Sequence, residues 1–184
     1  TFIDKAVKRF SDALEFKVEE IQWSTMMMNL GYAHLAMVNA LFVGGIVNSE
    51  PNMHYIPIIP GAISEAKRCF TEALTVIKPN AQRGAEWARI KIYQSECDLY
   101  EFLFIQIEQE KRMDKLHAVI EALKSACKLF SLTTGPTWFA RAQYHMGTVY
   151  EFLAKQCSKD EKDAKLDLEY KAVELYQNVA KVYA

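Results

Sequence analysis

The chain has 184 residues, 51% of them apolar, and it carries 22 Lys and Arg against 23 Asp and Glu, for a net charge of -1. This apolar content excludes a disordered chain and is enough for one packed core. Nucleic-acid-binding domains carry a basic excess or stripe, so we expect no direct binding of DNA or RNA.

Seven helices are predicted, because the amphipathic stretches are long and only seven glycines and five prolines interrupt the chain. We expect them at residues 2–20, 23–43, 61–78, 84–110, 114–132, 137–157 and 163–183. Pro79-Asn80 and Thr134-Gly135-Pro136 mark breaks between successive helix pairs. The predicted fold class is therefore all-α.

The first helix, residues 2–20, contains the pattern A-xxx-F-xx-A-L from Ala6 onward, and the helix at 61–78 repeats it from Ala66. This pattern resembles the second helix of a tetratricopeptide repeat. Close packing is its physical reason: a small residue lets the neighbouring helix approach, and an aromatic residue one turn later fills the gap.

The second helix, residues 23–43, lies in a stretch from Ser24 to Ser49 that contains no Asp, Glu, Lys or Arg. Its length would span a bilayer. However, it includes polar residues such as Asn29 and His34, and it lacks the Lys/Arg asymmetry of a membrane segment. We therefore expect a helix buried between neighbours, and no membrane span.

The segment 47–61, VNSEPNMHYIPIIPG, is proline-rich yet apolar, and we expect a loop there. Loops are normally polar and lie on the surface. The apolar side chains of this one, including Tyr55 and Ile58, either pack back on the helices or dock a partner. Both interpretations remain open from the sequence.

The later helices contain a second repeat, because Tyr100-Glu101-Phe102-Leu103 recurs as Tyr150-Glu151-Phe152-Leu153. A small residue precedes each tyrosine by three positions, and an alanine follows each by 22. The aligned slots are Gly31, Cys97 and Gly147 in the first helices of the pairs, and Ala66, Ala122 and Ala172 in the second helices, with Ala6 beginning the alanine series.

These correspondences predict an α-solenoid of antiparallel helix pairs, tetratricopeptide-like, with about 3.5 extended repeats in a single domain at residues 1–184. The alanine spacings are 60, 56 and 50 residues, which exceeds the family's unit of about 34 residues. The first helix has no partner of its own unit and no polar capping helix closes the array, so we expect a fragment of a longer protein.

In such an array the first helices line a groove that holds a peptide or a helix of a protein partner. The family's spacing from the small-residue slots predicts the groove-facing positions. They are Thr25, Met28, Tyr32 and Leu35, then Lys91, Gln94, Asp98 and Glu101, then Arg141, Tyr144, Thr148 and Glu151. Met28 and Tyr32 stand where one subclass of the family begins a Lys/Asn clamp for acidic chaperone tails, so we do not expect chaperone binding.

No motif in the sequence indicates catalysis, a metal or a cofactor. The four histidines form no HExxH or ExxH, and no GxxxxGK[ST], GxGxxG or GxSxG occurs. The cysteines, Cys69, Cys97, Cys127 and Cys157, form no CxxC pair and lie among apolar neighbours, which indicates buried, reduced thiols of a cytoplasmic or nuclear protein. We therefore predict a protein that is not an enzyme, with no cofactor and no small-molecule substrate.

A finer resemblance rests on scattered segments of these helices. They are Asp4–Phe10, Asn29–Gly31, Ala62–Leu74, Trp87, Ala140–Ala142, Val149-Tyr150 and Tyr170–Ala172. In this layout the chain resembles the C-terminal repeat region of the erythroid differentiation-related factor 1 family. That resemblance implies a nuclear, transcription-associated regulatory subunit that acts through partners. The sequence thus predicts a protein–protein interaction scaffold, with this regulatory role as the alternative.

Overall fold

The computed structural model describes residues 2–14, 19–47, 57–80, 82–104, 109–158 and 160–184. These ranges contain seven α-helices and no β-strand, which confirms the predicted all-α class. The helices are α1 (Phe2–Leu14), α2 (Glu20–Val47), α3 (Ile58–Val76), α4 (Gly84–Phe104), α5 (Gln109–Cys127), α6 (Pro136–Gln156) and α7 (Lys162–Tyr183).

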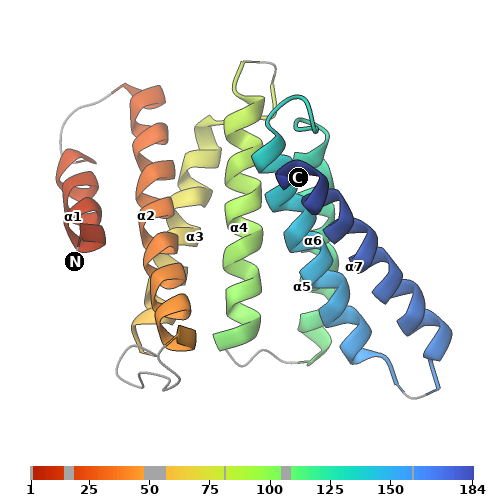
Figure 1. Cartoon of the computed structure of the whole chain (residues 1–184). Coiled ribbons are helices and arrows are strands. Elements are labelled where there is room, and N and C mark those ends of the chain that lie inside the picture. Colours follow the sequence, from red (N-terminus) through yellow and green to blue (C-terminus); the bar gives the residue numbers. More distant parts are fainter. Residues whose placement is uncertain (1, 15–18, 48–56, 81, 105–108, 159) are drawn as a thin grey trace.

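Consecutive helices run antiparallel and stand side by side, with α1 at one end of the row and α7 at the other (Figure 1). Among the described helices, α1 packs against α2 alone and α7 packs against α6 alone. The middle helix, α4, contacts α2, α3, α5 and α6. Side chains of α4 are therefore placed to join the two halves of the fold.

Two hydrophobic clusters form the core, and α4 contributes to both. The first cluster joins α2, α3 and α4, and the second joins α4, α5 and α6. Ile90 belongs to the first and Ile92 to the second, and both are fully buried. Successive helical residues are about 100° apart, so residues two positions apart point to nearly opposite sides. A helix that is apolar on two sides is stable only between neighbours.

The predicted end of the second helix at residue 43 is wrong, because α2 continues through Gly44 and Gly45 to Val47. A glycine inside a helix costs only about 1 kcal/mol relative to alanine, so it weakens a helix without ending it. No helix within the described ranges, α2 included, is long and apolar enough to cross a membrane.

Part of the predicted loop at 47–61 is helical. The helix α3 begins at Ile58 instead of 61, with Pro57 at the N-cap and Pro60 in the first turn. Proline is tolerated there because the N–H that it lacks would have no partner within the helix.

The breaks that carry a glycine or proline signal are confirmed: α3 ends before Pro79, and Gly135, with φ of 73°, leads into Pro136 at the start of α6. Apart from the two bounds corrected above, the ends that differ from the prediction lie where no glycine or proline marks a boundary. They are Glu20 instead of 23 and Cys127 instead of 132. The predicted ends at 20 and 110 and the predicted start at 114 adjoin residues 15–18 and 105–108, which lie outside the described residues.

The four cysteines are free thiols, as predicted, but only two of them are fully buried. Cys69 and Cys97 lie in the core, whereas Cys127 and Cys157 are half-buried. Burial raises the pKa of Cys69 to about 11, so this thiol is protonated at neutral pH. Its environment is that of a small core residue.

Candidate functional site

Two of the predicted small-residue slots face an aromatic ring on the second helix of their pair. A Cβ added at Gly31 in α2 would lie 2.7 Å from the ring of Phe70 in α3, and one at Gly147 in α6 would lie 2.6 Å from the ring of Tyr176 in α7. Carbon atoms in contact are separated by about 3.5 Å or more. Glycine therefore permits an approach that alanine would obstruct.

The slot in the middle pair packs differently. Cys97 of α4 belongs to the cluster of α2, α3 and α4. Ala126 of α5, at the position that corresponds to Phe70 and Tyr176, belongs instead to the cluster of α4, α5 and α6. The middle slot is therefore turned toward the preceding helix pair, and the three pairs are not exact copies.

A polar network centred on Glu96 crosses the side of the molecule formed by α2, α4 and α6. Oε1 of the buried Glu96 accepts a hydrogen bond of 3.0 Å from Nδ2 of Asn39 in α2. Oε2 accepts one of 3.1 Å from Nε of Arg141 in α6, and another from its Nη2. Nε2 of His145 lies 3.5 Å from the same oxygen. One buried carboxylate thus links three helices.

The electrostatics of this network keep Glu96 ionised. Burial by itself would raise the pKa of Glu96, but His145 and Arg141 outweigh burial and lower the pKa to about 2. A buried charge is tolerated only when it is paired and hydrogen-bonded, and Arg141 provides both the opposite charge and the hydrogen bonds.

Aromatic rings surround the guanidinium of Arg141. Its Cζ lies 5.1 Å from the ring centroid of Tyr93 and 5.9 Å from that of Trp138. Tyr93 also contacts Tyr32 of α2, with 5.1 Å between ring centroids. Tyr32 is 43% exposed and Tyr144 is 52% exposed. Tyrosine, tryptophan and arginine dominate the binding energy of protein interfaces, so this side has the composition of a binding surface.

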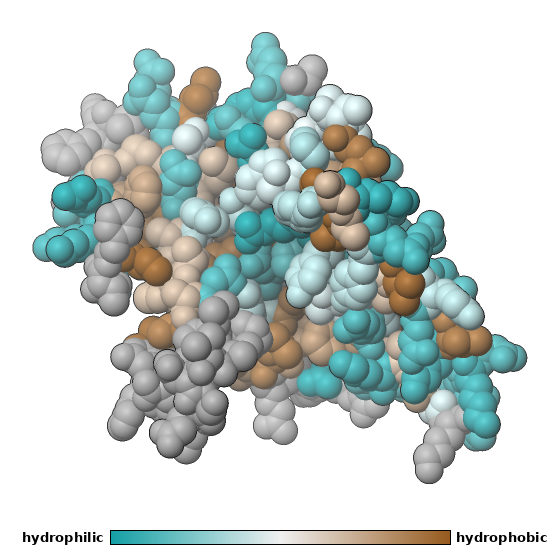
Figure 2. Space-filling model, in the orientation of Figure 1, coloured by the Kyte–Doolittle hydropathy of each residue, from teal (hydrophilic) through white to brown (hydrophobic). Residues whose placement is uncertain are grey.

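We call this side the α2–α4–α6 face and define it by Tyr32, Tyr93, Glu96, Arg141 and Tyr144. It is turned toward the reader in Figure 1, where α3 and α5 lie behind. Figure 2 shows residues of intermediate to low hydropathy over its middle and hydrophobic residues along α7. The middle of the face is therefore amphipathic and not purely apolar.

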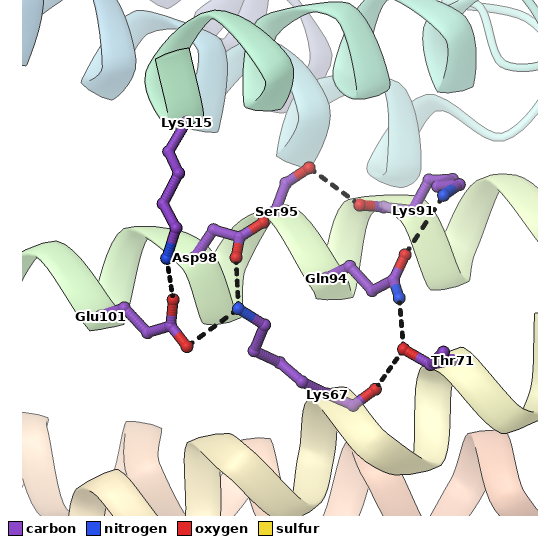
Figure 3. Close-up of polar contacts among 8 residues, drawn as sticks. All are labelled: Lys67, Thr71, Lys91, Gln94, Ser95, Asp98, Glu101 and Lys115. Carbon is purple, nitrogen blue, oxygen red and sulfur yellow. Dashed lines mark hydrogen bonds and ion pairs between the residues drawn. The ribbon is translucent and has the colours of Figure 1, made fainter. Parts of the chain in front are cut away.

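A second polar network lies on the opposite side of α4, between α3 and α5 (Figure 3). Nζ of Lys67 in α3 lies 2.7 Å from Oδ1 of Asp98 and 2.8 Å from Oε1 of Glu101, both in α4. Lys115 in α5 donates a hydrogen bond of 3.0 Å to Oε2 of Glu101. Burial by itself would raise the pKa of Glu101, but the two lysines lower it. We call these four residues the α3–α4–α5 network.

The structure divides the predicted groove positions between the two sides of α4. Tyr32, Arg141 and Tyr144 lie on the α2–α4–α6 face. The positions predicted on α4 point to the other side, since Asp98 and Glu101 pair with lysines of α3 and α5. On that side Gln94 also donates a hydrogen bond of 3.4 Å to Thr71 of α3 and accepts one of 3.3 Å from Lys91. This division follows from the turned slot at Cys97.

The remaining predicted positions are scattered. Leu35 is fully buried, and Met28 packs half-buried against the same core cluster. Glu151 is exposed on α6 and lines a pocket against α7. Ile58 is 46% exposed at the start of α3. Tyr55 lies outside the described residues.

Sequence reasoning missed Glu96, Tyr93 and Asn39, which hold the α2–α4–α6 face together. One signal was present for Glu96, because it stands directly before the slot residue Cys97 on a side of the helix that is otherwise apolar. A carboxylate in such a position needs a partner from another helix. The identity of that partner depends on tertiary packing.

The described ranges contain no group of three or more His, Cys, Asp or Glu side chains that could hold a metal ion. Glu96 and His145 do face one another, but the guanidinium of Arg141 occupies the space beside them and would repel a cation.

Comparisons with family models, with curated proteins and with solved structures return no match for this chain. The resemblances given above therefore rest on the residues of this sequence alone.

Proposed function

We propose that the chain is a non-catalytic scaffold that binds a peptide or a helix of a partner protein on its α2–α4–α6 face, within a tetratricopeptide-like α-solenoid. The observation that carries this proposal is the fixed position of Arg141 between aromatic rings, with exposed Tyr32 and Tyr144 on the same face. Side chains that are ordered before binding lose less conformational entropy when a partner docks. Glu96 provides that order.

The solenoid part of the proposal is supported by two features. The first helices of successive pairs contact one another, α2 with α4 and α4 with α6, in addition to the contacts between consecutive helices. Gly31 and Gly147 also occupy equivalent positions against aromatic rings. Side-by-side first helices present one continuous surface to a ligand, as repeat arrays do.

A photo-crosslinking amino acid tests the face directly. We would place it at Tyr32 or Tyr144 in the full-length protein in cells, with Glu121, whose side chain is 72% exposed on α5, as the control position. The proposal expects a protein adduct at the two tyrosine positions that is absent at Glu121.

The identified partner then allows a binding measurement with purified proteins. Tyr32→Ala and Tyr144→Ala should each raise the Kd about thirtyfold, the effect of losing an interface hot spot of about 2 kcal/mol. Equal adducts at all three positions, or unchanged affinity in both variants, would contradict the proposal.

A further inference from the structure

A groove of about 560 Å³ runs along α1, on a part of the molecule that the site above does not use. Its lining is Lys5, Ala6, Arg9, Phe10 and Ala13 of α1 together with Met26 of α2. Ala6, Phe10 and Ala13 are half-buried, and the two cations are exposed. The groove therefore has an apolar floor and a positively charged edge.

The apolar floor is the first copy of the A-xxx-F-xx-A pattern, and the second copy shows how this pattern is normally covered. In α3 the residues Ala66, Phe70 and Ala73 are all 0% exposed. The Phe70 ring packs where Gly31 of α2 leaves room for it. In α1 the corresponding aromatic residue, Phe10, is only half-buried: it packs against the core cluster of α2, α3 and α4 and also lines the groove.

The contacts of Gly31 with Phe70 and of Gly147 with Tyr176 share a second feature, which concerns the residue three positions after each glycine. After Gly31 this residue is His34. Burial lowers the pKa of His34, and the carboxylate of Glu65, five residues before Phe70, opposes that shift. The two side chains are thus electrostatic neighbours across the helix pair.

The pair α6 and α7 repeats this arrangement. Tyr150 stands three residues after Gly147, and Lys171 stands five residues before Tyr176. The pKa of Lys171 is raised first by its hydrogen bond to Asp167 and, more weakly, by the nearby Tyr150. The residue five positions before Phe10 is Lys5. If another helix packed its glycine against Phe10 in the same register, the residue three positions after that glycine would lie beside the ammonium group of Lys5.

We propose that this groove binds a helix of a partner protein that presents a glycine to Phe10 and, three residues later, an Asp or Glu to Lys5. Arg9 at the same edge adds to the attraction for a carboxylate. A second copy of the chain does not fit this description, because none of its seven glycines is followed three residues later by Asp or Glu. The binding mode is a helix laid in a groove.

The experiment uses a labelled peptide with the sequence of residues 136–156, which carries Gly147, and measures fluorescence anisotropy with the whole chain. A peptide with Tyr150→Glu should bind at least about tenfold more tightly than one with Tyr150→Lys, the factor for about 1.4 kcal/mol. The chain variant Lys5→Glu should reverse this preference, and Gly147→Leu in the peptide should abolish binding. Lys8→Glu, an equal charge change on α1 outside the groove, should leave the preference unchanged.

The variant Lys5→Glu changes an exposed charge and keeps the packed ring of Phe10. It therefore tests the groove even where a Phe10→Ala variant does not fold. Equal affinity for the Glu and Lys peptides would overturn the proposal. Peptide binding that is lost in the chain variant Tyr176→Ala but kept in Lys5→Glu would also overturn the proposal. The peptide, which has the sequence of α6, would then be bound in the place of α6 against α7 and not in the groove along α1. A dimer of the chain that Lys5→Glu dissociates would make a second copy the occupant. Tyr32→Ala should not change peptide binding, so the scaffold proposal is tested separately.

Discussion

Gly31 and Gly61 both lie in helices, but only one of them faces a side chain that an added methyl group would strike. A Cβ at Gly31 meets the Phe70 ring at 2.7 Å, whereas a Cβ at Gly61 meets nothing within 4 Å. Phe70 is fully buried, so its ring has little room to move away. The same chemical change should therefore have opposite effects at the two positions.

We expect Gly31→Ala to lower the free energy of unfolding by about 1–3 kcal/mol through overpacking. Gly61→Ala should raise it by about 0.5–1 kcal/mol, because alanine is the better helix former. Urea denaturation of both variants measures these changes. In the double variant Gly31→Ala/Phe70→Leu, leucine is smaller than the phenylalanine ring, so adding Gly31→Ala to Phe70→Leu should cost less free energy of unfolding than Gly31→Ala does alone. If Gly31→Ala stabilises the chain as Gly61→Ala does, the packing of Phe70 against Gly31 is contradicted.

Stability at acid pH should depend on Glu96. Its pKa is about 2 in the folded chain and 4.5 ordinarily, so the unfolded state binds the proton first. The contribution of Glu96 is then fully present above about pH 5 and is lost as the pH falls toward 2. The shift corresponds to about 3 kcal/mol at about 1.36 kcal/mol per pKa unit.

Denaturation of the wild type and Glu96→Gln between pH 2 and 6 measures this contribution. The variant should be about 2–3 kcal/mol less stable at pH 6, since it also leaves Arg141 without its partner. The two curves should converge near pH 2. A difference that stays constant over the whole pH range would show that Glu96 contributes through packing and not through its charge.

At the scale of the helices, the α3–α4–α5 network is the clearest electrostatic link between neighbouring helices. Lys67→Met removes the ammonium that bridges Asp98 and Glu101, whose side chains are 28% and 15% exposed. We expect a loss of about 1 kcal/mol in low salt, and less in 1 M NaCl because salt screens partly exposed pairs. Urea denaturation at two salt concentrations measures it.

Lys124→Met is the matched control, since Lys124 is 51% exposed and forms its ion pair with Glu121 on its own helix. Such a pair contributes a few tenths of a kcal/mol at most. If both lysine variants lose the same stability with the same salt dependence, the network does not tie the helices together.

The helices also show what the sequence can and cannot predict. Seven helices and the breaks at Pro79 and Gly135 followed from local signals. Tyr32, Arg141 and Tyr144, which the spacing of the tetratricopeptide family predicts as groove-facing, lie on the α2–α4–α6 face. The orientation of α4 about its own axis did not follow from local signals, because a helix that is apolar on two sides can pack with either side toward a given neighbour. Which side faces the preceding pair depends on long-range contacts of Cys97, which local periodicity does not contain.

At the scale of the whole molecule, α4 has two structural roles that depend on each other. It carries both core clusters, and it carries the two polar networks on its remaining sides. The α2–α4–α6 face is therefore built on the best-supported helix of the fold, which agrees with the rigid binding surface that we propose. The groove along α1 lies instead on a helix that contacts one neighbour.

This difference predicts an order of hydrogen exchange. Amides of α4 should exchange most slowly, and those of α1 and α7 should exchange early, because helices with few buried contacts open at a lower free-energy cost. Exchange followed by mass spectrometry measures all helices at once.

A glycine-bearing helix bound in the groove would give α1 a second neighbour, so it should slow exchange in α1 and leave α7 unchanged. Equal slowing of α1 and α7 would indicate a general stabilisation and not a helix seated against Phe10.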